Sequence, residues 1–99
     1  MDPDLPDFMI ADVVISKAGR DAGALYYVIG VDDVYLILAN GKDRSLEQPK
    51  RKKRKHAEKV LRSETRVAEK LRAGDKVLNS ELRRDLAYFR QRLQVNPGG

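Results

Sequence analysis

Apolar residues recur along the chain with two different periods, and the change between them divides the chain in two. In the first half they form short runs rich in β-branched residues, which is typical of β-strands. These runs are MIADVVIS at 9–16, ALYYVIGV at 24–31 and VYLILA at 34–39. Asp32-Asp33 predicts the turn between the second and third runs. Asn40-Gly41 is typical of tight hairpins and predicts a turn into a short fourth strand at 43–47.

After His56 the spacing of the apolar residues becomes helical. The residues at this spacing are Ala57, Val60, Leu61, Val67, Ala68 and Leu71. Ser63 is placed to cap a helix over 64–73, and Gly74 is placed to end it. Asn79 or Ser80 is placed to cap a second helix. Its apolar stripe is formed by Leu82, Leu86, Phe89 and Leu93.

These patterns predict an α+β protein, mainly β with C-terminal helices. We expect a small five-stranded β-barrel followed by two short helices. The length of 99 residues fits one compact domain with a small appendage. The segments that we expect are a flexible acidic leader at 1–7, the barrel with the basic strand or loop at 8–58, a helical extension at 59–94 and a loose tail at 95–99.

The net charge of +5 conceals a strong asymmetry between the two halves. Residues 1–48 contain four Lys or Arg and nine Asp or Glu, whereas residues 49–99 contain sixteen and six. Pro49 is followed by six consecutive basic residues, at 50–55, and then by His56. This segregation of charge indicates a polyanionic partner, either nucleic acid or an anionic membrane surface. The run at 50–55 also fits a charged edge strand or a nuclear localisation signal.

The composition argues against several classes of function. There is no cysteine, which removes disulfides, thiol nucleophiles and cysteine-ligated metals. His56 is the only histidine and cannot by itself form a multi-histidine metal site. No nucleophile is paired with a base, so we expect a non-enzyme without metal or cofactor. No apolar run approaches the roughly 20 residues of a membrane span, and the acidic N-terminus is unlike a signal peptide, so we expect a cytoplasmic protein without a membrane partner.

The segment SKAGRDAG at 16–23 joins the first two predicted strands and raises a functional question. Gly19 and Gly23 fit a turn that requires positive φ, which glycine adopts readily. Glycines also let the backbone approach a ligand, so that its N–H groups donate to phosphate while Lys17 and Arg20 supply charge. The two interpretations are compatible.

The order of strand, basic residue, glycine, charged pair, glycine and strand resembles the KOW motif of small SH3-like barrels. The longer run from VVISKAGRDAG through PKRKKRKH to GDKVLNSELRRDL, roughly residues 10–88, is similar to a family of small bacterial KOW-domain proteins. That family is related to KOW-type large-subunit ribosomal proteins. Ala22 departs from the pattern, in which a lysine often precedes the second glycine. The resemblance implies an SH3-like barrel that binds RNA.

We therefore expect a non-enzymatic RNA-binding protein whose partner is large-subunit ribosomal RNA, recognised by its shape. Ribosomal proteins are further candidate partners, and away from the ribosome we expect a monomer. The alternative is a KOW-type protein-interaction adaptor in transcription or translation, since the acidic first half suits a basic partner. Surface charge near the barrel rim discriminates between the two.

The candidate RNA-binding residues come from two turns and from the basic run, which by charge count should be the main anchor. They are Lys17, Gly19, Arg20, Gly23, Lys42, Arg44, Lys50, Arg51, Lys52, Lys53, Arg54, Lys55 and His56. The arginines of the last helix extend this footprint. Tyr26, Tyr27 and Tyr35 are candidates for base stacking, although alternation along a strand predicts that at most one of Tyr26 and Tyr27 faces the core.

Overall fold

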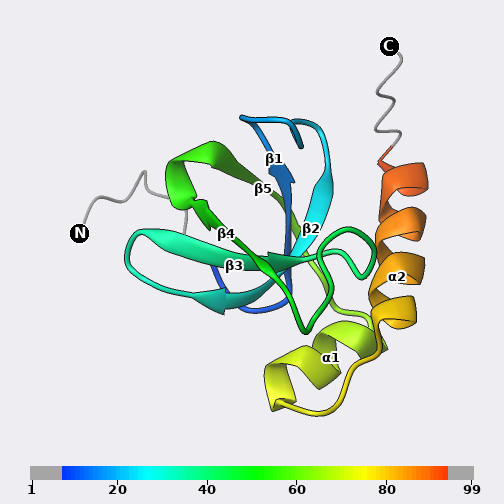
Figure 1. Ribbon diagram of the computed structural model, residues 1–99. Coiled ribbons are helices and arrows are strands. Elements are labelled where there is room, and N and C mark those ends of the chain that lie inside the picture. The colour runs from blue at the N-terminus through cyan, green and yellow to red at the C-terminus, as the bar shows by residue number, and fades with distance from the viewer. Residues whose placement is uncertain (1–7, 94–99) are drawn as a thin grey trace.

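The computed structural model describes residues 8–93, which form a five-stranded antiparallel sheet and two C-terminal helices (Figure 1). The elements are β1 (Asp12–Ser16), β2 (Leu25–Val31), β3 (Tyr35–Ala39), β4 (Lys50–Lys53), the 3₁₀ turn η1 (Arg54–His56), β5 (Ala57–Arg62), α1 (Arg66–Ala73) and α2 (Asn79–Arg92). The expected mainly-β class with two helices at the C-terminal end is confirmed. The predicted leader at 1–7 and tail at 95–99 lie outside the described residues.

The sheet is strongly curled, as its connectivity requires. The strand order is β4-β3-β2-β1-β5, so β4 and β5 are its two edges. In a flat sheet these edges would lie about 19 Å apart, since neighbouring strands are about 4.8 Å apart. Only the three residues of η1 separate the two strands in the chain, and such a link spans at most about 14 Å. The edges therefore bend toward each other (Figure 1).

Both faces of this sheet are buried. Tyr26 lies inside the curl with apolar residues from the strands, together with Phe8 and Ala57. Tyr27 lies on the other face, where α1 and α2 cover the sheet with Val67, Ala68, Leu82, Leu86 and Phe89. Both tyrosines are almost fully buried. The expectation that at most one of them faces the core was therefore wrong, because the helices give the sheet a second buried face.

A polar cluster joins the helices to β2. The Tyr27 hydroxyl lies 2.7 Å from the Asp85 carboxylate on α2, and the Thr65 hydroxyl at the start of α1 lies 2.6 Å from the same oxygen. The Tyr27 hydroxyl is also within hydrogen-bond distance of the Ser63 hydroxyl, at 2.9 Å. Burial and the neighbouring Asp85 carboxylate raise the pKa of Tyr27, so the phenol stays a protonated donor. The cluster therefore fixes both helices against one strand.

The predicted strand at 43–47 is absent, and β4 starts later, at Lys50. Asn40 closes a wider loop instead of a tight hairpin: its side-chain oxygen accepts from the N–H groups of Lys42, at 2.9 Å, and Arg44, at 3.0 Å. The chain leaves the sheet here to contact the start of α2, where Asn79 accepts from the Leu46 N–H at 2.8 Å. The predicted turn at Asp32-Asp33 is confirmed, closed by the Asp32 N–H to the Tyr35 carbonyl.

The apolar spacing from residue 57 onward indicated a helix. This prediction was wrong for residues 57–62, which form β5. Val13 pairs with Leu61 and Val14 with Lys59, so Val60 is an extra residue at a bulge. The bulge makes two adjacent apolar residues, Val60 and Leu61, pack on the helix-covered face. That breaks the period of two and imitates a helical spacing. The predicted segment boundary between residues 58 and 59 falls inside this strand, and the sheet continues to Arg62.

The helices are close to their predicted positions, with different caps. Thr65, not Ser63, caps α1 by accepting from the Ala68 N–H, while Gly74 ends the helix at φ +75° as expected. At α2 the Glu81 carboxylate accepts from the Leu78 N–H, at 2.9 Å, so neither Asn79 nor Ser80 is the cap. Ser63 is instead buried in the polar cluster.

Candidate nucleic-acid interface

The turn at residues 16–23 is closed by its own backbone. Gly19 has φ +86° and Gly23 has φ +92°, which confirms that both glycines serve a turn. The N–H groups of Ala22, Gly23 and Ala24 all donate to carbonyls within residues 16–21. Those three donors are therefore not free for a phosphate, and the side chains of the turn carry its binding capacity.

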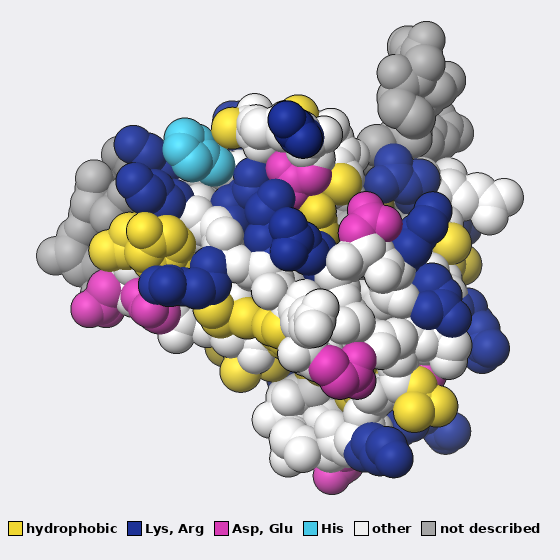
Figure 2. All heavy atoms as spheres, viewed as in Figure 1, with side chains coloured by type: hydrophobic (Ala, Val, Ile, Leu, Met, Phe, Trp, Pro, Cys, Tyr) yellow, Lys and Arg dark blue, Asp and Glu magenta, His cyan; other side chains and the backbone are white. Residues whose placement is uncertain are grey.

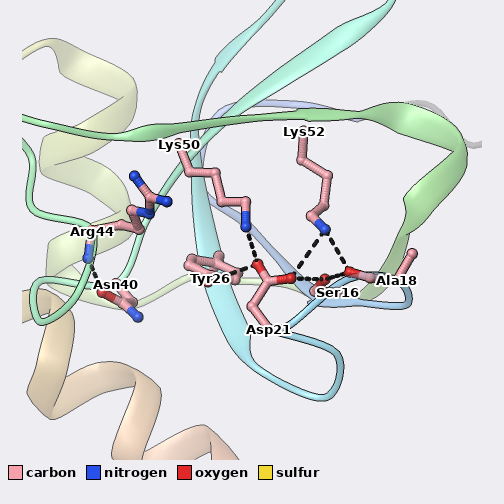
Figure 3. Close-up of polar contacts among 8 residues, drawn as sticks. All are labelled: Ser16, Ala18, Asp21, Tyr26, Asn40, Arg44, Lys50 and Lys52. Atoms are coloured by element: carbon pink, nitrogen blue, oxygen red, sulfur yellow. Dashed lines mark hydrogen bonds and ion pairs between the residues drawn. The ribbon is translucent and has the colours of Figure 1, made fainter.

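Asp21 is the centre of a polar network that the sequence analysis did not identify (Figure 3). Its carboxylate accepts from the hydroxyls of Ser16 and Tyr26, both at 2.9 Å. From β4, Lys50 approaches it to 2.7 Å and Lys52 to 3.1 Å. Lys52 also donates to the Ala18 carbonyl, at 2.9 Å. The turn is thus tied to β4 by charge.

The network determines the ionisation of Asp21. Burial alone raises the pKa of this carboxyl, but hydrogen bonds from Lys50, Ser16, Lys52 and Tyr26 outweigh it and hold the pKa well below its usual range. Burial and the same carboxylate raise the pKa of Tyr26. Asp21 is therefore charged and Tyr26 protonated at neutral pH.

The alternation of a β-strand splits the basic run into two sets. Lys50 and Lys52 pair with Leu38 and Leu36 of β3, so they lie on the inner face and reach Asp21. Lys52 is only 8% exposed. Arg51 and Lys53 alternate to the outer side and are exposed. The run at 50–55 was also interpreted as a charged edge strand. Its first four residues do form a strand, β4, at an edge of the sheet.

The outward-facing part of the run has its own contacts. The Arg51 guanidinium lies 4.2 Å from the centroid of the Tyr35 ring, a cation–π distance. Arg54 donates to the Asp32 carbonyl, at 2.9 Å. Lys53 and Arg54 line an open pocket of about 340 Å³ with Lys55, Asp33 and Val34. This pocket, at the turn between β2 and β3, shares no residue with the hollow beside Asp21.

Other basic residues are engaged with acids. Lys59 and Arg62 on β5 lie 3.2 Å and 3.1 Å from the fully buried Asp12 carboxylate. Lys17 lies 4.0 Å from Glu58 on the surface, a pairing that contributes little. His56 is half-buried, and its carbonyl accepts from the Lys17 N–H, at 2.8 Å. Counting basic residues along the sequence therefore overestimates how many of them can bind a ligand, because several are paired with acids in the folded protein.

Three predicted residues meet around one pocket between the two turns. Arg20, Arg44 and Lys50 line an open hollow of about 430 Å³, together with Asp21, Ala22, Ala24, Tyr26 and Asp43. Figure 3 shows Arg44 and Lys50 on one side of Asp21. We call Arg20, Arg44 and Lys50 the cation cluster. The two predicted turns thus lie side by side at this end of the sheet.

The cation cluster belongs to a broader basic face. Figure 2 shows Lys and Arg side chains spread over the loop region and α2, with isolated acids between them. Of the predicted residues, Lys42 lies in an adjoining groove beside α2, whereas Arg51 and Lys53 lie elsewhere. Gly19 and Gly23 shape the turn but do not line the hollow. The predicted residues are therefore distributed over more than one site.

Comparisons with known proteins add no family assignment. No protein-family model matches the chain, and no curated protein matches it significantly. Within residues 8–93, no group of three or more His, Cys, Asp or Glu side chains is arranged to hold a metal ion. In the same range no helix has the length and apolar character to cross a membrane.

Proposed function

We propose that this protein is a KOW-type SH3-like barrel that binds RNA without catalysing a reaction, with large-subunit ribosomal RNA as its ligand. The observation that carries the proposal is the cation cluster at the junction of the two turns. Arg20 and Arg44 are exposed there, and Lys50 lines the same hollow while paired with Asp21 at 2.7 Å. Clustered cations in an open hollow suit the phosphates of a nucleic acid backbone.

The strand arrangement supports the barrel in this proposal. A five-stranded antiparallel sheet whose two edges are linked by a single 3₁₀ turn, with an apolar core inside the curl, is what a small SH3-like barrel requires. The turn between β1 and β2 has both of its glycines at positive φ, which fits the role of the KOW loop.

The mechanism is electrostatic and positional. Arg20 and Arg44 supply charge to the phosphates, and the Asp21 network fixes the turn and Lys50 before RNA arrives. Preorganisation of this kind lowers the entropy lost on binding. Phosphate contacts carry no sequence information, so the RNA is selected by the geometry of its backbone.

The protein-interaction adaptor ranks second. An acidic rim would favour the adaptor. The rim near the two turns instead carries three basic residues, Arg20, Lys42 and Arg44, beside Asp43. We therefore retain RNA as the ligand, with ribosomal proteins as neighbours on the ribosome. We propose a cytoplasmic protein that is monomeric away from it.

Affinity capture from a bacterial lysate at low and high salt tests the function directly. We expect large-subunit ribosomal RNA among the sequenced captured RNA at about 50 mM salt, with strong loss at about 200 mM, because each phosphate contact releases counterions. If proteins are captured at low salt but no RNA is enriched, RNA binding is refuted. Enrichment of other RNA alone would refute the ribosomal assignment.

A further inference from the structure

We propose that the groove between α2 and the loop at 40–44 is a second phosphate-binding site, which takes the part of the same RNA strand that continues from the cation cluster. This inference rests on the proposed RNA binding. The groove has a volume of about 360 Å³ and is open to solvent. It is lined by three basic residues, Lys42, Arg83 and Arg90, and by one acid, Asp43.

The geometry of α2 brings its two arginines to this groove together. An α-helix turns by about 100° per residue, so Arg83, Ala87 and Arg90 fall within about 60° of one another. This strip flanks the buried stripe of Leu82, Leu86 and Phe89, so it lies at the boundary between the helix and the sheet. Arg84 and Arg92 fall on a different face.

The groove adjoins the cation cluster. Ala24 and Asp43 line both pockets, so the two hollows share a wall. A strand whose phosphate sits near Arg20 and Arg44 therefore passes directly to Lys42 and Arg90. The floor of the groove is apolar, formed by Ala24, Leu25, Leu86 and Ala87, and it accommodates the sugar between two phosphates.

The charges of the groove are available to a ligand. Arg83 donates one bond to the Gly41 carbonyl, at 2.6 Å, which fixes its position and leaves most of its five donors unused. In residues 8–93, neither Lys42 nor Arg90 forms an ion pair with a carboxylate. An acidic peptide is the competing occupant, but the position beside the cation cluster favours a polyanion that extends over both hollows.

The test compares Lys42→Gln/Arg90→Gln with a charge-matched control, Lys76→Gln/Arg66→Gln. Lys76 is exposed in the link between the helices and Arg66 is exposed at the start of α1, and neither lines the groove or the cation cluster. Arg83 is left intact because it supports the loop. Binding of a fluorescein-labelled hairpin RNA is measured by anisotropy over a salt series. Thermal melts check that both variants are folded.

We expect the groove variant to bind about tenfold more weakly than the wild type, with a shallower salt dependence, while the control stays within about twofold. If the groove variant binds RNA as tightly as the wild type, the second site is wrong and the proposed function still stands. The same conclusion follows if the control variant is weakened as much as the groove variant. Absence of RNA binding by the wild type would overturn both. Tighter binding of poly-glutamate than of RNA by the wild type, abolished in the groove variant, would assign the groove to an acidic protein instead.

Discussion

Replacement of Gly41 by alanine is expected to lower the free energy of unfolding by about 2 to 5 kcal/mol. Gly41 has φ +76°, a conformation that costs an L-residue about 1 to 2 kcal/mol. A Cβ there would meet the backbone oxygen of Asn79 at 2.2 Å, so α2 or the loop must move. Overpacking of this kind adds about 1 to 3 kcal/mol. Urea unfolding followed by circular dichroism measures the change.

Gly74→Ala is the matched control for this prediction. Gly74 has φ +75°, almost the same as Gly41, but no atom lies within 4 Å of a Cβ built there. Its alanine variant is expected to lose only about 1 to 2 kcal/mol, the conformational part. If the two variants unfold at the same urea concentration, the loop at 40–44 does not pack against α2 as described. Because Gly41 belongs to the loop that carries Lys42 and Arg44, its variant should also bind RNA more weakly.

Replacement of Asp21 by asparagine is expected to remove about 2 to 4 kcal/mol of stability. Lys52 and Lys50 are 8% and 23% exposed, and Asp21 is 15% exposed, so the variant leaves largely desolvated ammonium groups without their counter-charge. Asparagine keeps the shape of the side chain, so the loss reports charge more than packing. Asp33→Asn, in an exposed turn, is the control and should change stability by less than about 0.5 kcal/mol.

The same carboxylate gives stability a defined pH dependence. The pKa of Asp21 is lower in the folded protein than its ordinary value of 3.8, so the folded state binds fewer protons there than the unfolded state. Its contribution is complete above about pH 4 and is lost as the pH falls below that value toward the folded pKa. Acid unfolding of Asp21→Asn should therefore be less steep below pH 4 than that of the wild type. Parallel acid profiles would contradict the network.

The first three strands were predictable because they are apolar runs rich in β-branched residues, and the turns between them contain glycine or paired aspartates. The two edge strands were harder to predict: an edge strand was one of several interpretations of the run at 50–55, and the apolar spacing at 57–62 indicated a helix. The run KRKK has no apolar residue to mark an inner face, so its assignment as β4 depends on pairing with β3 and on Asp21, both distant in the sequence. In β5 a bulge at Val60 disturbed the period of two.

The candidate site was predicted in part. Both turns were identified, and Arg20, Arg44 and Lys50 do meet. Asp21 was overlooked because an acid beside Arg20 in a glycine-containing turn gives no local sign of facing inward. One signal was present: alternation within KRKK places two lysines on one side, and an inward lysine needs a carboxylate. The groove beside α2 could not be predicted, because it forms only where the loop at 40–44 packs against that helix, and the two are distant in the sequence.

The most direct test of the account is the salt dependence of RNA binding by Arg20→Gln/Arg44→Gln. It is measured by anisotropy with the hairpin RNA, beside the wild type and the control Lys76→Gln/Arg66→Gln. Each phosphate contact contributes about 0.7 to 0.9 to the slope of log K against log salt. If the cation cluster holds two phosphates, the slope of the cluster variant is shallower by about 1.4 to 1.8, and that of the control is unchanged. An unchanged slope in the cluster variant would contradict the account.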